Sequence, residues 1–342
     1  MTLRLSLFLI AALVLSACGN DANTSTTDEP TADGPLVVYT GRSQSLVDDA
    51  VERFREATGV EVEVRYGRDA EILAALNEEG AASPADLFWA NTAGALGAAV
   101  EAGLLKAAPD SLLARPAAFV PSGGSWVPVT TRFRTLAYDP NDIDPATLPT
   151  SVRDIPSREA LRGRIGWTPT YSSFQDFITA LRMTEGDETA GAWLTGMRAL
   201  DPVAYTSNTS MLEALVAGDI DVALTNHYYI LRVTETTDGD PPVATHRFAA
   251  GDPGNLALVT GAGLLETSDQ DGAAAQFLSF LLSDDAQRDA AQRVFEYPVV
   301  GVETPTYLVP LEEARELGPA IDFEQLRDIE GTLALLRDQE LL

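Results

Sequence analysis

Apolar runs alternate with amphipathic stretches along the first quarter of the chain. Three short segments are either continuously apolar or alternate apolar and acidic side chains, which is typical of strands. Two intervening segments carry apolar residues at helical spacing and stop at Gly59 and Gly80, as helices often do. The predicted strands are residues 36–39, 60–64 and 85–89, and the predicted helices are 46–58 and 70–79. This order indicates an α/β protein with a mostly parallel sheet covered by helices.

The same patterns predict the elements of the remaining chain. The strands are expected at 126–139, 163–167, 219–225 and 257–265. The helices are expected at 174–184, 187–200, 204–217, 273–294 with a break at 283–285, and about 323–337. After the leader and tether described below, about 308 residues remain, which exceeds one hydrophobic core and therefore favours two lobes.

Ligand-binding loops are expected where the strands end. In open parallel sheets, ligands bind beyond the carboxyl ends of the strands, where residues 40–45 and 90–92 would lie. Residues 168–173 are rich in hydroxyl groups and precede a predicted helix. They could simply cap that helix, or its free amides could bind an anion.

The first eighteen residues have the features of a lipoprotein leader. Arg4 precedes the apolar segment 5–15, which is too short to span a bilayer, and Leu15-Ser16-Ala17-Cys18 has the form of a lipobox. We therefore expect a signal peptide at 1–17, a lipid on Cys18 and a flexible polar tether over 18–33. An ordinary secretory signal is the alternative. Cys18 is the only cysteine, which excludes an intramolecular disulfide.

The net charge narrows the range of partners. The chain carries a formal charge of −28, and Arg4 is the only charged side chain that removal of residues 1–17 would take away. Such a field disfavours nucleic acid and anionic membrane surfaces. Two histidines and no pair of closely spaced cysteines leave no basis for a zinc site. Neither a nucleotide-binding glycine loop nor a serine-hydrolase or zinc-protease motif occurs, so the sequence does not favour an enzyme.

Two adjacent tyrosines, Tyr228 and Tyr229, are the strongest candidate for chemistry. Phenol oxygen is a hard ligand that suits ferric iron once a bound cation lowers its pKa. An aromatic pair that only packs its rings is the alternative. Successive side chains of a strand point to opposite faces, so two tyrosines that share one ion require the backbone to turn into a helix, expected to run through Val233.

Several short segments, taken in their order along the chain, resemble segments of the ferric-iron-binding proteins of ATP-binding-cassette importers. This family is a branch of the bilobal transferrin-like binding proteins. The similarity covers essentially all of the chain after the tether, and the tyrosine pair within Asn226-His227-Tyr228-Tyr229 is its most specific part. The other similar segments are 37–42, 83–89, 94–96, 102–105, 162–166, 252–254 and 296–298.

The resemblance implies a two-lobed periplasmic-binding-protein fold. Each lobe would hold a mostly parallel sheet flanked by helices, and hinge strands would cross between the lobes. The N-terminal lobe would comprise 34–131 and about 258–308, and the C-terminal lobe about 132–257 and 309–342. The lobes would close over one ferric ion, and the protein would be a monomer.

The resemblance also implies a set of site residues. Tyr228 and Tyr229 would supply phenolates, and Tyr171 could supply a third or could only line the cleft. Two positions that hold histidine and glutamate ligands in other members are Ser43 and Asn91 here. Phosphate or carbonate would be held by Ser172, Ser173, Asn208 and Asn226. Arg132 and Arg134 would face the cleft and balance charge, or would form surface ion pairs.

The implied role is capture of ferric iron outside the cytoplasm and delivery to a permease and its ATPase. The lipid on Cys18 would hold the protein at the membrane, and no catalytic cofactor is expected. Binding of a small organic or oxyanion solute by the same fold remains an alternative, and so does a passive surface lipoprotein.

Overall fold

The computed structural model describes residues 34–116, 118–237, 239 and 241–342. The predicted leader, Cys18 and the tether therefore lie outside the described residues. The described residues belong to one compact unit. In the described ranges, no helix combines the length and the apolar character that crossing a membrane requires.

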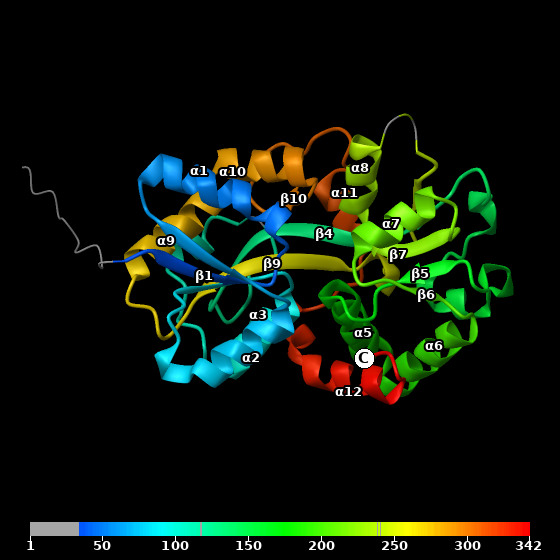
Figure 1. Ribbon diagram of the computed structural model, residues 1–342, viewed down its shortest axis with the longest axis horizontal. Coiled ribbons are helices and arrows are strands. Elements are labelled where there is room, and N and C mark those ends of the chain that lie inside the picture. Colours follow the sequence, from blue (N-terminus) through cyan, green and yellow to red (C-terminus); the bar gives the residue numbers. More distant parts are fainter. Residues whose placement is uncertain (1–33, 117, 238, 240) are drawn as a thin grey trace, which may run out of the picture. The chain divides into compact units, whose positions relative to one another are not determined.

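Ten strands form the sheet (Figure 1). Their order is β2-β1-β3-β9-β4-β7-β5-β6, and β8 and β10 each pair with β4. The strands are β1 Leu36–Thr40, β2 Val62–Tyr66, β3 Leu87–Ala90, β4 Val127–Tyr138, β5 Ile165–Trp167, β6 Val203–Ala204, β7 Val222–Asn226, β8 Ala244–His246, β9 Ala257–Leu264 and β10 Tyr297–Pro298.

Helices flank the sheet on both sides. They are α1 Asp48–Thr58, α2 Asp69–Glu79, α3 Ala93–Glu101, α4 Asp110–Leu113, α5 Ser172–Glu185, α6 Asp187–Ala199, α7 Asn208–Val216, α8 His227–Thr236, α9 Asp271–Leu281, α10 Asp284–Asp289, α11 Leu311–Leu317 and α12 Ile329–Asp338. The predicted break at 283–285 is confirmed, because α9 ends at Leu281 and Ser283 caps α10 by accepting a hydrogen bond from the amide of Ala286.

The predicted strand–helix order of the first quarter is confirmed. β1 pairs in parallel with β2 and with β3, and the connections pass through α1 and α2. Gly59 ends α1 in the left-handed conformation at φ 74°, which glycine adopts without steric cost. The sheet thus places the ends of β1 and β3 at the same edge.

Two strands, β4 and β9, link the two ends of the sheet. The first half of β4 pairs with β9, and its second half, from Arg134 to Tyr138, pairs with β7. These pairs are antiparallel, as is β3 with β9, whereas β5 pairs in parallel with β6 and β7. The fold is therefore an α/β sheet with parallel outer strands and two antiparallel strands that cross the middle.

The two largest apolar clusters of the core lie at opposite ends of the sheet. One includes Phe54, Leu87 and Phe277, between β1–β3 and the helices α1 and α9. Another includes Trp167, Phe177 and Trp193, between β5 and β7 and the helices α5 and α6. Separate clusters are the arrangement that two lobes require, but the residue boundaries of the lobes stay a prediction.

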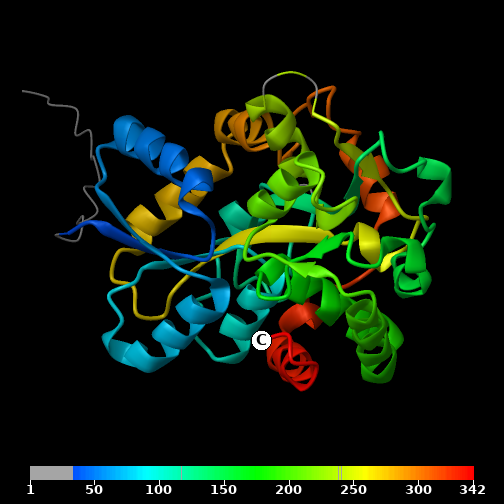
Figure 2. The same cartoon turned by 45° about the vertical axis from the view of Figure 1, so that its right-hand side comes forward.

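The expected single helix over about 323–337 is wrong at its start. Residues Phe323–Arg327 form a separate 3₁₀ helix, and α12 begins only at Ile329. Asp328 separates the two because its side chain accepts a hydrogen bond from the amide of Gly331 and caps α12. The 3₁₀ helix packs on α3, and α12 packs on α5 (Figure 2).

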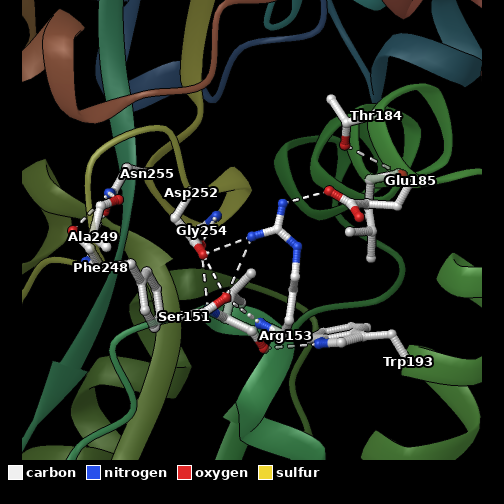
Figure 3. Close-up of polar contacts among 12 residues, drawn as sticks. Ser151, Arg153, Thr184, Glu185, Trp193, Phe248, Ala249, Asp252, Gly254 and Asn255 are labelled. Carbon is white, nitrogen blue, oxygen red and sulfur yellow. Dashed lines mark hydrogen bonds and ion pairs between the residues drawn. The ribbon is translucent and has the colours of Figure 1, made fainter.

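A buried carboxylate, Asp252, fixes the loop before β9 (Figure 3). Its oxygens accept hydrogen bonds from the amides of Val152 and Gly254, and it pairs with Arg153 at 3.1 Å. Arg153 also pairs with Glu185 at the end of α5. A Cβ on Gly254 would lie 2.3 Å from the ring of Phe248, so only glycine fits this turn. Asp252 and Gly254 of the segment 252–254 therefore have a role in folding.

A second buried carboxyl group, Asp176 on α5, has no such partners. Its side chain is fully buried, and neither oxygen has a hydrogen-bond partner, although Thr92 and Gly94 lie near it. Burial and the nearby carboxylate of Asp69 raise the pKa of Asp176 to about 7, against the opposing effect of Arg132. The pKa of Asp69 is raised to about 6, again chiefly by burial.

Asp176→Asn should stabilise the protein increasingly as the pH rises from 5 to 8. The folded-state pKa lies above the value of about 3.9 for an unfolded aspartate. The contribution of Asp176 is therefore complete below that value and is lost as the pH rises through about 7. The difference in the free energy of unfolding between variant and wild type should reach about 4 kcal/mol, measured by chemical denaturation at each pH. Exposed Glu188→Gln on α6 is the control, and a constant gap for Asp176→Asn would contradict the assignment.

Candidate functional site

The tyrosine pair lies at the junction between β7 and α8. β7 ends at Asn226 and α8 begins at His227, so the backbone turns into a helix where the sequence required it. Antiparallel pairing of Asn226 with Arg134 of β4 fixes the place of this turn. The rings of Tyr228 and Tyr229 lie 4.1 Å apart between centroids and 31° from parallel, and both residues are buried. The two phenols can therefore serve one ligand.

Tyr171 belongs to the same cluster. It follows β5 and immediately precedes α5, and its hydroxyl oxygen lies 3.1 Å from that of Tyr229. β5 and β7 are parallel neighbours, so the residues after each strand meet at one edge of the sheet. The structure thus gathers three phenols that are far apart in the sequence.

Burial keeps Tyr228 and Tyr229 protonated in the absence of a cation. Desolvation raises the pKa of Tyr228 above its ordinary value, and Tyr171 and Glu296 raise it further, while Arg132 lowers it. Desolvation also raises the pKa of Tyr229 well above 10, together with the two neighbouring tyrosines. Only a strong positive charge would favour the phenolate form here.

Four buried polar groups at this edge lack hydrogen-bond partners. They are the hydroxyls of Thr168 and Ser173 and the amide nitrogens of Asn208 and Asn226. All four residues are fully buried. Unpartnered buried donors cost free energy, so the arrangement favours a ligand that accepts hydrogen bonds. Sequence reasoning identified all of these residues except Thr168, whose place in the hydroxyl-rich loop was the available signal.

Two helix N-termini add backbone donors at the same edge. α5 begins after Tyr171 and α8 after Asn226, and in neither case does a side chain cap the first turn. The free amides and the helix dipole both attract negative charge. By contrast, α7 is capped by Ser207, which accepts from the amide of Ser210.

Arg134 orients one of the free donors and adds positive charge. It donates to the side-chain oxygen of Asn226 at 3.4 Å and to the carbonyl of Leu224 at 3.3 Å. Because a guanidinium only donates, the amide nitrogen of Asn226 is left to face elsewhere. Arg134 is 3% exposed and stacks over Phe177. In the described part of the chain no carboxylate pairs with it, so the alternative of a surface ion pair is wrong.

The pKa of Arg134 shows how unfavourable this burial is. Desolvation and the neighbouring Arg132 lower it to about 9. A buried cation without a counter-ion destabilises the empty protein, and an anion bound nearby would offset that cost.

Arg132, Asn91 and Ser172 form a polar chain across the middle of the sheet. Buried Arg132 donates to the carbonyl of Asn91 at 2.7 Å and to that of Leu258 at 3.2 Å. The side-chain amide of Asn91 donates to the hydroxyl of Ser172 at 2.8 Å. These predicted site residues are therefore in direct contact with one another.

Ser43 does not join this cluster. It is exposed at the start of the short 3₁₀ helix Gln44–Leu46, and its side chain does not cap that helix. His227 does not supply a further ligand next to the tyrosines. His227 accepts from the amide of Phe133 and contacts the carbonyl of Phe295 at 2.8 Å, so both ring nitrogens are occupied. Burial lowers the pKa of His227 to about 4.

A buried ion pair whose carboxylate acts on Tyr228 was not anticipated as part of the site. Arg42 donates to Glu296 at 2.9 Å, and Thr130 also donates to this carboxylate. Burial alone would raise the pKa of Glu296, but Arg42 and Arg132 outweigh it and the pKa is lowered. Glu296 therefore stays charged close to Tyr228. Both residues lie in segments that carry the family resemblance, which was the available signal.

The donor set suits a hard cation together with an anion. In the described residues, no group of three or more histidine, cysteine, aspartate or glutamate side chains could hold a metal ion. The phenol oxygens are thus the candidate metal ligands, and hard oxygen donors suit a small, highly charged ion.

Comparison with known proteins gives a consistent result. Residues 36–293 match the family described as bacterial extracellular solute-binding protein. The "Fe(3+)-binding periplasmic protein" of Serratia marcescens is 30% identical over 322 residues, covering 93% of this chain and 92% of that protein. The "Major ferric iron-binding protein" of Neisseria meningitidis serogroup B is 29% identical over 273 residues, covering 77% and 80%.

A solved structure shows the same fold. The crystal structure of iron-bound HitA from Pseudomonas aeruginosa matches with a TM-score of 0.84 and 32% identity, over 89% of this chain and 99% of that chain. The family match, the relatives and the shared fold lead to one conclusion. The chain belongs to the family of bacterial extracellular solute-binding proteins.

Proposed function

We propose that this protein captures ferric iron outside the cytoplasm and delivers it to the permease of an ATP-binding-cassette importer. Tyr228, Tyr229 and Tyr171 would bind the ion as phenolates. The observation that supports this proposal most strongly is that three tyrosine side chains lie together. The hydroxyl groups of Tyr171 and Tyr229 are in contact, and buried hydrogen-bond donors without partners lie at the same edge of the sheet. The iron-binding names of the relatives support the same assignment.

The charges of the site favour a bound anion beside the iron. One ferric ion and three phenolates together carry no net charge. Arg134 then remains as a buried cation without a carboxylate partner. Phosphate or carbonate between Ser173, Asn208 and Asn226 would balance it and satisfy the free donors. Thr168, in the loop after β5, and Ser172, the first residue of α5, would complete the anion site.

Closure of two lobes would trap the ion. The N-terminal lobe is proposed to comprise 34–131 and about 258–308, and the C-terminal lobe about 132–257 and 309–342. The separate core clusters at the two ends of the sheet support this division. The lobes would open at the permease to release iron, and the protein would act as a monomer and without catalysis.

A small organic or oxyanion solute is the second candidate. The unpartnered donors and Arg134 could bind an oxyanion without iron. The tyrosine cluster distinguishes the two functions, because an oxyanion needs no phenolates whereas ferric iron does. The visible spectrum therefore separates them directly.

Purified protein should acquire a visible absorption band when ferric citrate is added. Tyr228→Phe and Tyr229→Phe should each weaken ferric binding by about 100-fold or more, because each removes a hard ligand that lies inside the protein. Tyr171→Phe should weaken binding and shift the band. Titration against a competing chelator measures the affinity.

Tyr297→Phe is the matched control. Tyr297 is 2% exposed and packs on Phe133 and His227, but it lies outside the three-phenol cluster. Its loss should leave the band and the affinity unchanged. Colourless wild-type protein that takes up no iron would instead favour the oxyanion function.

Ser173→Ala should weaken iron binding in phosphate or carbonate buffer by about tenfold without lowering the thermal stability of the iron-free protein. Its hydroxyl is buried and unpartnered, so removal costs the empty protein little, whereas a hydrogen bond to a charged ligand is lost. Thr179→Ala on the same helix is the control. Its hydroxyl contacts the carbonyl of Gln175 and the hydroxyl of Thr332, so stability should fall and affinity should not. A drop in stability for Ser173→Ala with unchanged affinity would refute the anion role.

We also propose that a lipid on Cys18 anchors the secreted protein to the membrane, at the bacterial cell surface or at the periplasmic face. The lipobox form of residues 15–18 and the polar segment that follows support this proposal. Partners would then be the permease and ATPase subunits in the same membrane.

Cys18→Ala should move the protein from the membrane fraction to the soluble fraction of expressing cells, because the lipid attachment site is lost. Immunoblots of the separated fractions measure this directly. Wild-type protein that is already soluble would indicate an ordinary secretory signal at the N-terminus.

A further inference from the structure

Asn91 stands at a junction of three elements. It follows β3 and is 4% exposed. Its amide N–H donates to Asp69 of α2 at 2.9 Å, and its carbonyl accepts from Arg132 of β4 at 2.7 Å. Its side-chain amide donates to Ser172, the first residue of α5, at 2.8 Å. The backbone of Asn91 is thus fixed by α2 and β4, and its side chain contacts the start of α5.

The contact between Asn91 and Ser172 joins the two proposed lobes. Asn91 belongs to the segment 34–131, and Ser172 belongs to the segment 132–257. Their side chains can meet only when these parts lie together. In the proposed division into lobes this hydrogen bond crosses from one lobe to the other, so separation of the lobes would break it.

The direction of this hydrogen bond determines what Ser172 can do. Because Ser172 accepts from the amide of Asn91, its own hydroxyl proton points to another acceptor. Ser172 begins the uncapped α5, beside the unpartnered hydroxyl of Ser173. The oriented hydroxyl can therefore donate to an anion at this helix N-terminus.

Neighbouring charges explain why a neutral amide suits this position. Asp69 contacts the backbone of Asn91, and Asp176 is buried nearby against α3 without a hydrogen-bond partner. A third carboxylate would add repulsion to a region that already buries two. An amide makes the same contact and remains a donor.

We propose that Asn91 is a positioning residue that couples lobe closure to anion binding. It holds Ser172 with its hydroxyl proton directed to the anion, and so slows the escape of iron from the closed protein. Asn91 touches neither the iron nor the anion. This inference rests on the proposed function, because it assumes that iron and an anion bind beside the tyrosines.

Release of iron to excess chelator at several phosphate concentrations tests this inference. Wild-type protein should release iron more slowly as phosphate increases. Asn91→Ala should release it about five- to tenfold faster and respond less to phosphate, the change expected for one lost hydrogen bond. The visible band should not change, because the phenolates are untouched.

Two further variants sharpen the result. Ser172→Ala should release iron at least as fast as Asn91→Ala, because it removes both the contact with Asn91 and the hydroxyl that donates to the anion. The double variant should be no faster than Ser172→Ala, because Asn91 acts only through Ser172. Asn91→Asp keeps the shape but can only accept, so the proton of Ser172 turns away from the anion and release should again be faster.

Three outcomes would overturn the proposal while leaving iron binding intact. They are wild-type release from Asn91→Ala, additive effects in the double variant, and a shifted band in Asn91→Asp, which would place position 91 in contact with the iron. Absence of a band in wild-type protein would instead refute the proposed function itself. Thermal unfolding of each iron-free variant confirms that the fold is retained.

Discussion

Burial of polar groups without partners is the constraint on which this site depends. Thr168, Ser173, Asn208 and Asn226 each keep an unpartnered donor away from solvent. Arg134 is buried without a carboxylate in contact, and the buried phenols have raised pKa values. Each feature costs stability in the empty protein. Their collection at one edge of the sheet indicates that a ligand, rather than folding, supplies the compensation.

The strands of the sheet make this collection possible. Parallel pairing of β5 with β7 brings Tyr171 next to Tyr229, and antiparallel pairing of β4 with β7 places Arg134 opposite Asn226. The middle strands β4 and β9 join both ends of the sheet, so Arg132 reaches Asn91 from the same strand that carries Arg134. The site therefore depends on register across the whole sheet, and not on one loop.

Local pattern predicted the elements better than their contacts. The strands and helices of the first quarter, the break before Asp284 and the turn after Asn226 follow from spacing, glycine and caps. The last helix was expected to be continuous because its apolar spacing continues through Asp328, and only the cap made by that side chain reveals the break. Capping depends on a local side-chain geometry that periodicity does not show.

Within the site, the types of residue indicated which side chains could bind a ligand, but they did not indicate which side chains contact one another. The tyrosine pair, the serines and the asparagines were identifiable, whereas the hydroxyl contact of Tyr171 and the buried pair of Arg42 and Glu296 depend on long-range packing.

A crystal structure of the protein loaded with ferric iron and phosphate tests the central claim most directly. The account predicts iron bound by the phenolate oxygens of Tyr171, Tyr228 and Tyr229, with phosphate on Ser173, Asn208 and Asn226. Iron bound elsewhere, or these three tyrosines still in contact only with one another, would contradict it.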